Sequence, residues 1–102
     1  MQIPLEAAEQ GDAAAENNLG FMYASGLGVV QDDLEAVRWY RMAAKQKYAG
    51  AQYNLGVVYD EGLGVTQDKV TQDKVEALRW YRLAAEQGRE EANAALKELD
   101  AK

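Results

Sequence analysis

One pattern occurs twice along the chain, and this repetition constrains the fold more than any other feature. Leu19 returns as Leu55, 36 positions later, and Trp39 returns as Trp80, 41 positions later. The positions that recur with the first spacing are Leu19-Gly20, Tyr23, Gly26, Gly28 and Val29, and those that recur with the second are Glu35-Ala36 and Trp39-Tyr40. Periods of this length are typical of stacked helical units, each of which buries its apolar face against its neighbours. The sequence therefore predicts a repeat protein, a class that usually binds other proteins and rarely carries out chemistry.

Within each copy, apolar residues recur at helical spacing. Ala15, Leu19 and Tyr23 lie at positions i, i+4 and i+8, which places them on one face of a helix that we call helix A. A second helix, helix B, carries a similar face from Ala36 to Ala44. The matching residues of the second copy are Ala51, Leu55 and Tyr59 for helix A, and Ala77, Tyr81 and Ala85 for helix B. Because alanine is abundant and proline occurs once, helix is favoured throughout.

The segment between helix A and helix B contains signals that end one helix and start the next. Gly26 and Gly28 follow helix A, where glycine adopts the left-handed conformation without steric cost. Asp32 and Glu35 have the D-x-x-E spacing of a capping box, so helix B is expected to begin beside Asp32. The acidic pair Asp32-Asp33 is interpreted as a solvated helix end, because the loop lacks the spaced carboxylates of a calcium site.

Two other recurring features are assigned to the core. Trp39-Tyr40 and Trp80-Tyr81 recur at one phase of helix B, which favours packing over a ligand-stacking role. Gly20 and Gly56 lie inside helix A, where glycine costs about 1 kcal/mol relative to alanine. A close approach of a neighbouring helix explains this cost, since a β-carbon would hold that helix away.

Partial copies of the pattern flank the two full copies. We expect a single repeat domain over residues 1–102. Its parts are a partial repeat that ends a helix B at 1–11, a first repeat at 12–47, a second repeat with a five-residue insertion at 48–88, and a C-terminal capping helix at 89–102. In the last of these, Lys97 stands where the full copies have glycine, and its outer side is polar, which suits a cap.

The insertion in the second repeat is an identical tandem. Val65–Lys69 reads VTQDK and is followed by the same five residues at Val70–Lys74. Either Asp68 or Asp73 can therefore start the second helix B. We expect Asp73, because Glu76 then completes the D-x-x-E box, an advantage of about 1 kcal/mol. The first copy then forms extra loop, at a closure cost below about 1 kcal/mol.

The duplication also leaves a third arrangement open. If the linker straightens, everything after it can pack on another copy of the chain, which gives a domain-swapped homodimer. An identical tandem in an otherwise ungapped pattern indicates a recent slip or deliberate engineering, and we favour engineering. The alternative function is thus a structural or engineered self-associating unit whose output is its oligomeric state.

Composition excludes several classes of function. The net charge of −6 disfavours attraction to phosphate backbones and anionic lipid, so we expect neither a nucleic acid nor a membrane as partner. There is no histidine or cysteine, and Ser25 is the one serine, so the usual acid–base and nucleophilic constellations cannot be built. We therefore expect no enzyme activity, no cofactor and no metal site. The compartment stays unknown: it is the bacterial cytoplasm or periplasm if the chain is natural.

The repeated residues resemble the Sel1-like repeat family, which is related to the tetratricopeptide repeats. The resemblance covers nearly the whole chain, from Ala7 to about Leu96, and both full copies carry its complete signature. That signature comprises the Leu-Gly and Tyr of helix A, the two loop glycines, the loop aspartate and the W-Y-x2-A-A end of helix B. The resemblance implies an all-α fold, a short right-handed superhelical solenoid of antiparallel helix pairs whose concave side holds partners. It also implies an adaptor that assembles protein complexes.

Helix phase predicts which residues face such a partner. The positions two before and two after each core leucine of helix A turn toward the concave side, and two acidic residues follow one turn later in the second copy. The predicted partner-binding residues are Asn17, Phe21, Tyr53, Val57, Asp60 and Glu61, with Asn18 and Asn54 at the edge. They form an apolar stripe with an acidic rim, which suits a peptide or helix carrying basic residues. Alternatively, neighbouring repeats bury Phe21 and Tyr53.

Overall fold

The computed structural model describes residues 4–62 and 74–100, and within these residues it is built from α-helices alone. In chain order they are α1 (Leu5–Glu9), α2 (Ala13–Ser25), α3 (Asp33–Lys45), α4 (Ala49–Glu61), α5 (Lys74–Glu86) and α6 (Glu90–Asp100). The two A helices are α2 and α4, and the two B helices are α3 and α5. The expected all-α class is confirmed.

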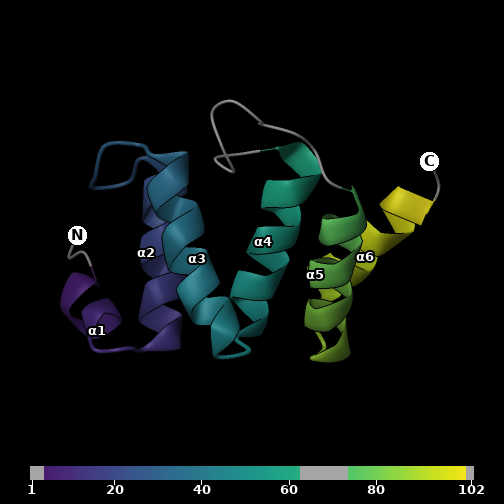
Figure 1. Cartoon of the computed structure of the whole chain (residues 1–102), viewed down its shortest axis with the longest axis horizontal. Helices are drawn as coiled ribbons and strands as arrows, with labels where there is room; N and C mark the ends of the chain where they lie inside the picture. Colours follow the sequence, from purple (N-terminus) through teal and green to yellow (C-terminus); the bar gives the residue numbers. More distant parts are fainter. Residues whose placement is uncertain (1–3, 63–73, 101–102) are drawn as a thin grey trace.

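The helices stack in sequence order (Figure 1), each packed against the one before it and the one after it. Pairs α2–α3 and α4–α5 make the most extensive contacts, so each A helix packs chiefly on the B helix of its own repeat. The α3–α4 contact joins the two repeats, and α1 and α6 pack at opposite ends of the row. This is the expected solenoid of antiparallel helix pairs.

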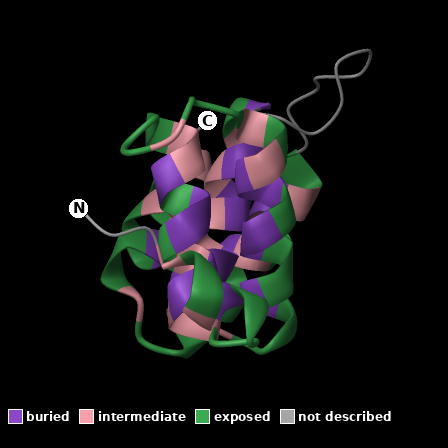
Figure 2. Cartoon of the chain, turned by 90° about the vertical axis from the view of Figure 1, so that its left-hand side faces the viewer, coloured by how far each residue is buried: buried purple, intermediate pink, exposed green. Residues whose placement is uncertain are grey.

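The core runs through the stack as three neighbouring clusters, one at each interface between repeats or half repeats. Leu19 and Leu55, the equivalent leucines of the A helices, are fully buried. Trp39 is also buried and packs against Ala8 of α1 and Ala15 of α2. Trp80 is half-buried and packs against the cluster between the two repeats. In Figure 2 the buried residues lie along the inner faces of the helices and the exposed ones outside. The core assignment of the aromatic residues is confirmed.

Helix A ends in the same way in both repeats. Gly26 and Gly62 have φ of 71° and 69°, the left-handed conformation that ends a helix, and their N–H groups donate to Met22 and Val58 respectively. The sequence prediction of a glycine stop at this point is confirmed.

The start of helix B departs from the expected capping box in one detail. The Asp32 carboxylate accepts hydrogen bonds from the N–H groups of Leu34 and Glu35, at 3.1 and 3.2 Å, so the predicted cap is present. The Asp32 N–H, however, donates to the Tyr23 carbonyl at 2.9 Å, and the Glu35 carboxylate pairs with Arg38 at 2.9 Å. The reciprocal half of the box is therefore replaced, because the backbone of helix A already satisfies the Asp32 N–H.

The second helix B resumes its normal register after the duplication. Helix α5 has 13 residues, as α3 has, and its first residue, Lys74, corresponds to Asp33. Asp73 itself and the displaced copy Val65–Lys69 lie outside the described residues.

The mid-helix glycines are explained by the tyrosines of helix B. A β-carbon placed on Gly20 would lie 2.7 Å from the ring of Tyr40, and one placed on Gly56 would lie 2.4 Å from the ring of Tyr81. Both distances are far inside the 3.5–4.0 Å optimum for carbon atoms in contact. Both tyrosines are buried, so their rings have no room to move away. The predicted close approach is confirmed, and its partner is an aromatic ring.

Replacing Gly56 by alanine is therefore expected to lower the free energy of unfolding, because overpacking costs about 1–3 kcal/mol. Alanine regains roughly 1 kcal/mol in helix propensity, so the expected net loss is up to about 2 kcal/mol. Urea unfolding followed by far-UV circular dichroism measures the difference. The control is Asn18→Ala on the exposed side of α2, which should leave stability unchanged or raise it. A Gly56→Ala protein as stable as the parent would contradict this explanation.

Candidate partner-binding site

The predicted partner-binding residues lie on α2 and α4, which meet through a pair of amide side chains. Asn54 Nδ2 donates a hydrogen bond of 2.9 Å to Asn17 Oδ1. Neither of these residues is fully buried. The bond joins the A helices of successive repeats, so residues of both repeats belong to one surface.

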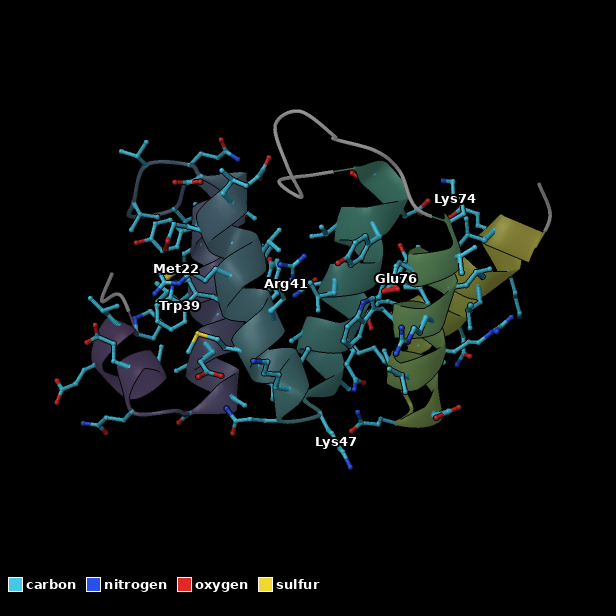
Figure 3. All side chains as sticks on the ribbon, in the orientation of Figure 1. Met22, Trp39, Arg41, Lys47, Lys74 and Glu76 are labelled. Carbon is cyan, nitrogen blue, oxygen red and sulfur yellow. The ribbon has the colours of Figure 1, made fainter. Side chains whose placement is uncertain are left out.

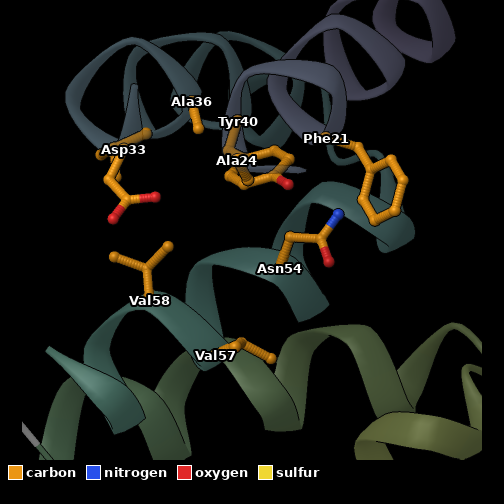
Figure 4. A pocket seen from close by; sticks show the side chains of 9 residues that line it. Phe21, Ala24, Asp33, Ala36, Tyr40, Asn54, Val57 and Val58 are labelled. Atoms are coloured by element: carbon orange, nitrogen blue, oxygen red, sulfur yellow. The ribbon is translucent and has the colours of Figure 1, made fainter. Parts of the chain in front are cut away.

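Phe21 is the most exposed of the apolar residues predicted here. It is 52 % exposed, although the two residues before it, Leu19 and Gly20, are buried. Beside it lies a cavity of about 180 Å³ between α2, α3 and α4 (Figure 4). The residues that line this cavity are Phe21, Ala24, Asp33, Ala36, Val37, Tyr40, Asn54, Val57 and Val58. The structure thus brings Phe21 and Val57 to one cavity.

Tyr53 lies on the next repeat and is partly covered by it. Its ring centroid is 5.8 Å from that of Tyr81, and the guanidinium carbon of Arg89 lies 5.9 Å from the Tyr53 ring. The residue is half-buried as a result. The neighbouring helices therefore cover part of Tyr53 and leave Phe21 exposed.

The two acidic residues at the end of α4 have different surroundings. The Asp60 carboxylate accepts hydrogen bonds from Lys74 Nζ and, at 3.3 Å, from the Tyr81 hydroxyl, so it connects α4 to the start of α5. Glu61 is exposed. Asp60 is thus engaged within the chain, and Glu61 is the freer of the two. Figure 3 shows Lys74 near the top of α5.

Asp33 belongs to the cavity and was not predicted as a site residue. Its carboxylate is directed into the space beside Val58 (Figure 4), and its Oδ1 accepts a hydrogen bond of 2.7 Å from Gln31 Nε2. From the sequence it was expected to belong to a solvated helix end. The signal that could have found it is its alignment with Lys74, since a reversed charge at equivalent positions marks a difference between the repeats.

The buried tyrosines of helix B have raised pKa values. Burial, and then the charge of Asp33, raises the pKa of Tyr40 to about 12. Burial also raises the pKa of Tyr81, with the charge and hydrogen bond of Asp60 adding to it. In each repeat a carboxylate thus raises the pKa of the buried tyrosine. Asp33 lies on the same helix as Tyr40, whereas Asp60 lies on the helix before that of Tyr81.

A buried polar contact within each repeat was also missed. Glu16 is 2 % exposed within α2, and its Oε1 accepts a hydrogen bond of 2.9 Å from Gln46 Nε2. Gln46 Nε2 also donates to the Gly11 carbonyl at 2.9 Å. The end of helix B is thereby bonded both to the A helix of its repeat and to the turn that precedes it.

The second repeat contains the same contact with different residues. Gln87 Nε2 donates to Gln52 Oε1 and to the Lys47 carbonyl, both at 2.8 Å, and Gln52 is 4 % exposed. Such a buried polar group is stable only when it is hydrogen-bonded. The recurrence of glutamine at the end of helix B, 41 positions apart, was the available signal.

Neither a metal centre nor a membrane span is found in the part of the chain that the structure describes. Residues 4–62 and 74–100 contain no group of three or more carboxylates placed to hold a metal ion. No helix among them is long and apolar enough to cross a bilayer.

Comparison with known proteins gives family and structural matches. The family model described as the Sel1 repeat matches residues 13–48 and 49–88. A Sel1 repeat protein from Oxalobacter formigenes is 41 % identical, with a TM-score of 0.80 over 88 % of this chain and 35 % of its own. The uropathogenic Escherichia coli protein c5321, a protective antigen displaying an SLR fold, is 49 % identical, with a TM-score of 0.80 over 87 % of this chain and 18 % of its own. The chain thus spans less than two thirds of either structure. A search of curated proteins found no match.

The raised tyrosine pKa values predict a loss of stability at high pH. An unfolded tyrosine loses its proton near pH 10, whereas Tyr40 holds its proton in the folded state to about pH 12. The stabilising effect is therefore complete below about pH 10 and is lost as the pH rises toward 12. The free energy of unfolding of the parent should fall over this range, relative to Tyr40→Phe, by on the order of 1 kcal/mol.

Urea unfolding of the two proteins at about pH 8, 10 and 12 measures this difference. Titration of lysines and arginines is common to both proteins and cancels. A difference that stays constant from pH 8 to 12 would contradict the raised pKa of Tyr40.

Proposed function

Since the chain belongs to the Sel1 repeat family, a family of protein–protein interaction modules, we propose that it binds another protein. It holds a peptide or a helix of that protein on the side formed by its A helices, α2 and α4. In this proposal that side is the concave face of the solenoid. The chain acts as a scaffold repeat that carries out no catalysis, and it takes a protein partner rather than a nucleic acid or a membrane.

The exposed Phe21 beside the cavity carries the proposal. An aromatic side chain that is 52 % exposed leaves a large apolar area in water. Aromatic anchors and the cavities beside them are where binding energy concentrates in protein interfaces. Val57 of the second repeat borders the same cavity, so a ligand seated on Phe21 contacts both repeats.

The polar residues of this face supply the hydrogen bonds and the charge. Asn17 and Asn54 present amide groups, which both donate and accept, near the middle of the face. Glu61 is exposed at one end, and Asp33 borders the cavity. Together with the net charge of −6, these carboxylates favour a partner with basic residues.

A competing surface lies between the B helices. A wider depression of about 490 Å³ is bordered by Trp80 and Leu83, with charged residues of both signs around it. Leu83 is 37 % exposed and lies on α5, outside the cavity beside Phe21. Because charges of both signs surround it, this depression favours neither a basic nor an acidic partner. We therefore assign the partner to the A helices and use Leu83 as the control position.

Selection from a random 12-residue peptide library displayed on phage tests the assignment, with the parent protein as bait. Phe21→Ser should weaken binding of the selected peptides about tenfold or more, because it removes the aromatic anchor. Leu83→Ser makes the same chemical change on the other side and should leave binding unchanged. Isothermal titration calorimetry with the synthetic peptides measures both.

The reverse pattern, in which Leu83→Ser removes binding and Phe21→Ser does not, would place the partner on the B helices and refute the assignment. Light scattering of the parent at several concentrations accompanies the measurement. A dimer that disappears when Val70–Lys74 is deleted would support the self-associating unit instead.

A further inference from the structure

The two repeats share the same helix pair and the same glycine–tyrosine contact, but they differ at one pair of positions that face each other. In the second repeat, Asp60 ends α4 and Lys74 begins α5, and Lys74 Nζ bonds both the carboxylate and, at 3.3 Å, the carbonyl of Asp60. The equivalent residues of the first repeat are Ala24 and Asp33. The carboxylate thus lies on helix A in the second repeat and on helix B in the first, where no described lysine or arginine forms a salt bridge with it.

This exchange explains the cavity beside Phe21. Ala24 has only a methyl group where Asp60 has a carboxylate, and Asp33 is shorter than the lysine it replaces. Both Ala24 and Asp33 line the cavity of about 180 Å³. Within the described residues, no lysine or arginine forms a salt bridge with Asp33. Among the residues that the structure describes, the cavity thus has a carboxylate in its wall that forms no salt bridge.

We propose that this cavity holds the side chain of one lysine from the partner, with its ammonium group on the Asp33 carboxylate and its methylenes against the apolar wall. The inference rests on the proposed function and identifies the residue of the partner that the site recognises. The partner's lysine supplies to the first repeat the cation that Lys74 supplies to the second.

The dimensions of the cavity fit a single side chain. Pockets for small-molecule ligands measure about 300–1,000 Å³, so a cavity of 180 Å³ is too small for such a ligand. Its wall includes Ala36 and Val58, whose apolar surface suits the four-carbon stem of lysine. Phe21 lies at its edge (Figure 4), so in this proposal its ring covers part of the stem from water.

The hydrogen bonding of Asp33 favours lysine over arginine. The bond from Gln31 Nε2, at 2.7 Å, takes one of the two lone pairs of its Oδ1 and hinders a second donor there. Arginine binds carboxylates best through two parallel bonds, which need both oxygens. Lysine is a compact point charge and needs only the remaining oxygen, Oδ2.

Asp33→Asn tests the proposal with the peptides selected on the parent. Those peptides should share a lysine, and changing it to norleucine, which keeps the stem and removes the charge, should weaken binding to the parent about tenfold. The same change should have little effect on binding to Asp33→Asn. Glu86→Gln on α5 removes one negative charge at an exposed position and should behave as the parent.

A second variant closes the cavity without removing Phe21. The double substitution Ala24→Asp with Asp33→Lys reproduces the pair of the second repeat and should weaken peptide binding about tenfold. Its free energy of unfolding, measured in urea, should equal or exceed that of the parent, which separates loss of the site from loss of the fold.

The outcomes distinguish the two proposals. Peptides that depend on Phe21 but bind Asp33→Asn as tightly as the parent would overturn the lysine site and leave the proposed function standing. Arginine that replaces the lysine with no loss would also overturn it. Selection of no Phe21-dependent peptide would refute the proposed function and this inference together.

Discussion

The contact between a glycine of helix A and a tyrosine of helix B sets the geometry of the whole stack. A β-carbon on Gly56 would lie 2.4 Å from the Tyr81 ring, so the two helices can approach this closely only because the side chain is absent. Glycine costs helix A about 1 kcal/mol relative to alanine. Burial of a tyrosine ring removes a large apolar area from water and outweighs this cost. The same contact joins Gly20 to Tyr40, so both repeats are built on one frame.

Because both repeats have the same helix packing, small sequence differences between them produce differences in surface shape and charge. Ala24 replaces the Asp60 of the other repeat, and Asp33 replaces Lys74. In the second repeat the resulting pair connects α4 to α5, and the Tyr81 hydroxyl donates to it. The first repeat has a cavity at the corresponding place, with a carboxylate in its wall. The glycine–tyrosine contact that the repeats share stabilises both of them. The positions at which they differ form the candidate site.

The fold was predictable because helix periodicity and glycine placement are local signals. Leu19, Gly20 and their repeats carry enough information to place helix faces and the close contact. The surroundings of the acidic residues were not predictable. Asp60 was expected on an exposed rim, but its carboxylate bonds Lys74, which is 14 residues further along the chain and on another helix. Asp33 was interpreted as solvated, since a single sequence shows its charge but not the cavity that Ala24 leaves beside it.

The Gly56–Tyr81 contact also spans the duplicated segment, so it reports directly on whether the second repeat keeps the frame of the first. Nuclear Overhauser effects in the isotope-labelled protein measure it. We expect cross-peaks between the Gly56 α-protons and the Tyr81 ring protons, matching those between Gly20 and Tyr40. In a mixture of labelled and unlabelled protein, these cross-peaks should arise within one chain. Their absence, or their appearance only between chains, would contradict the common frame.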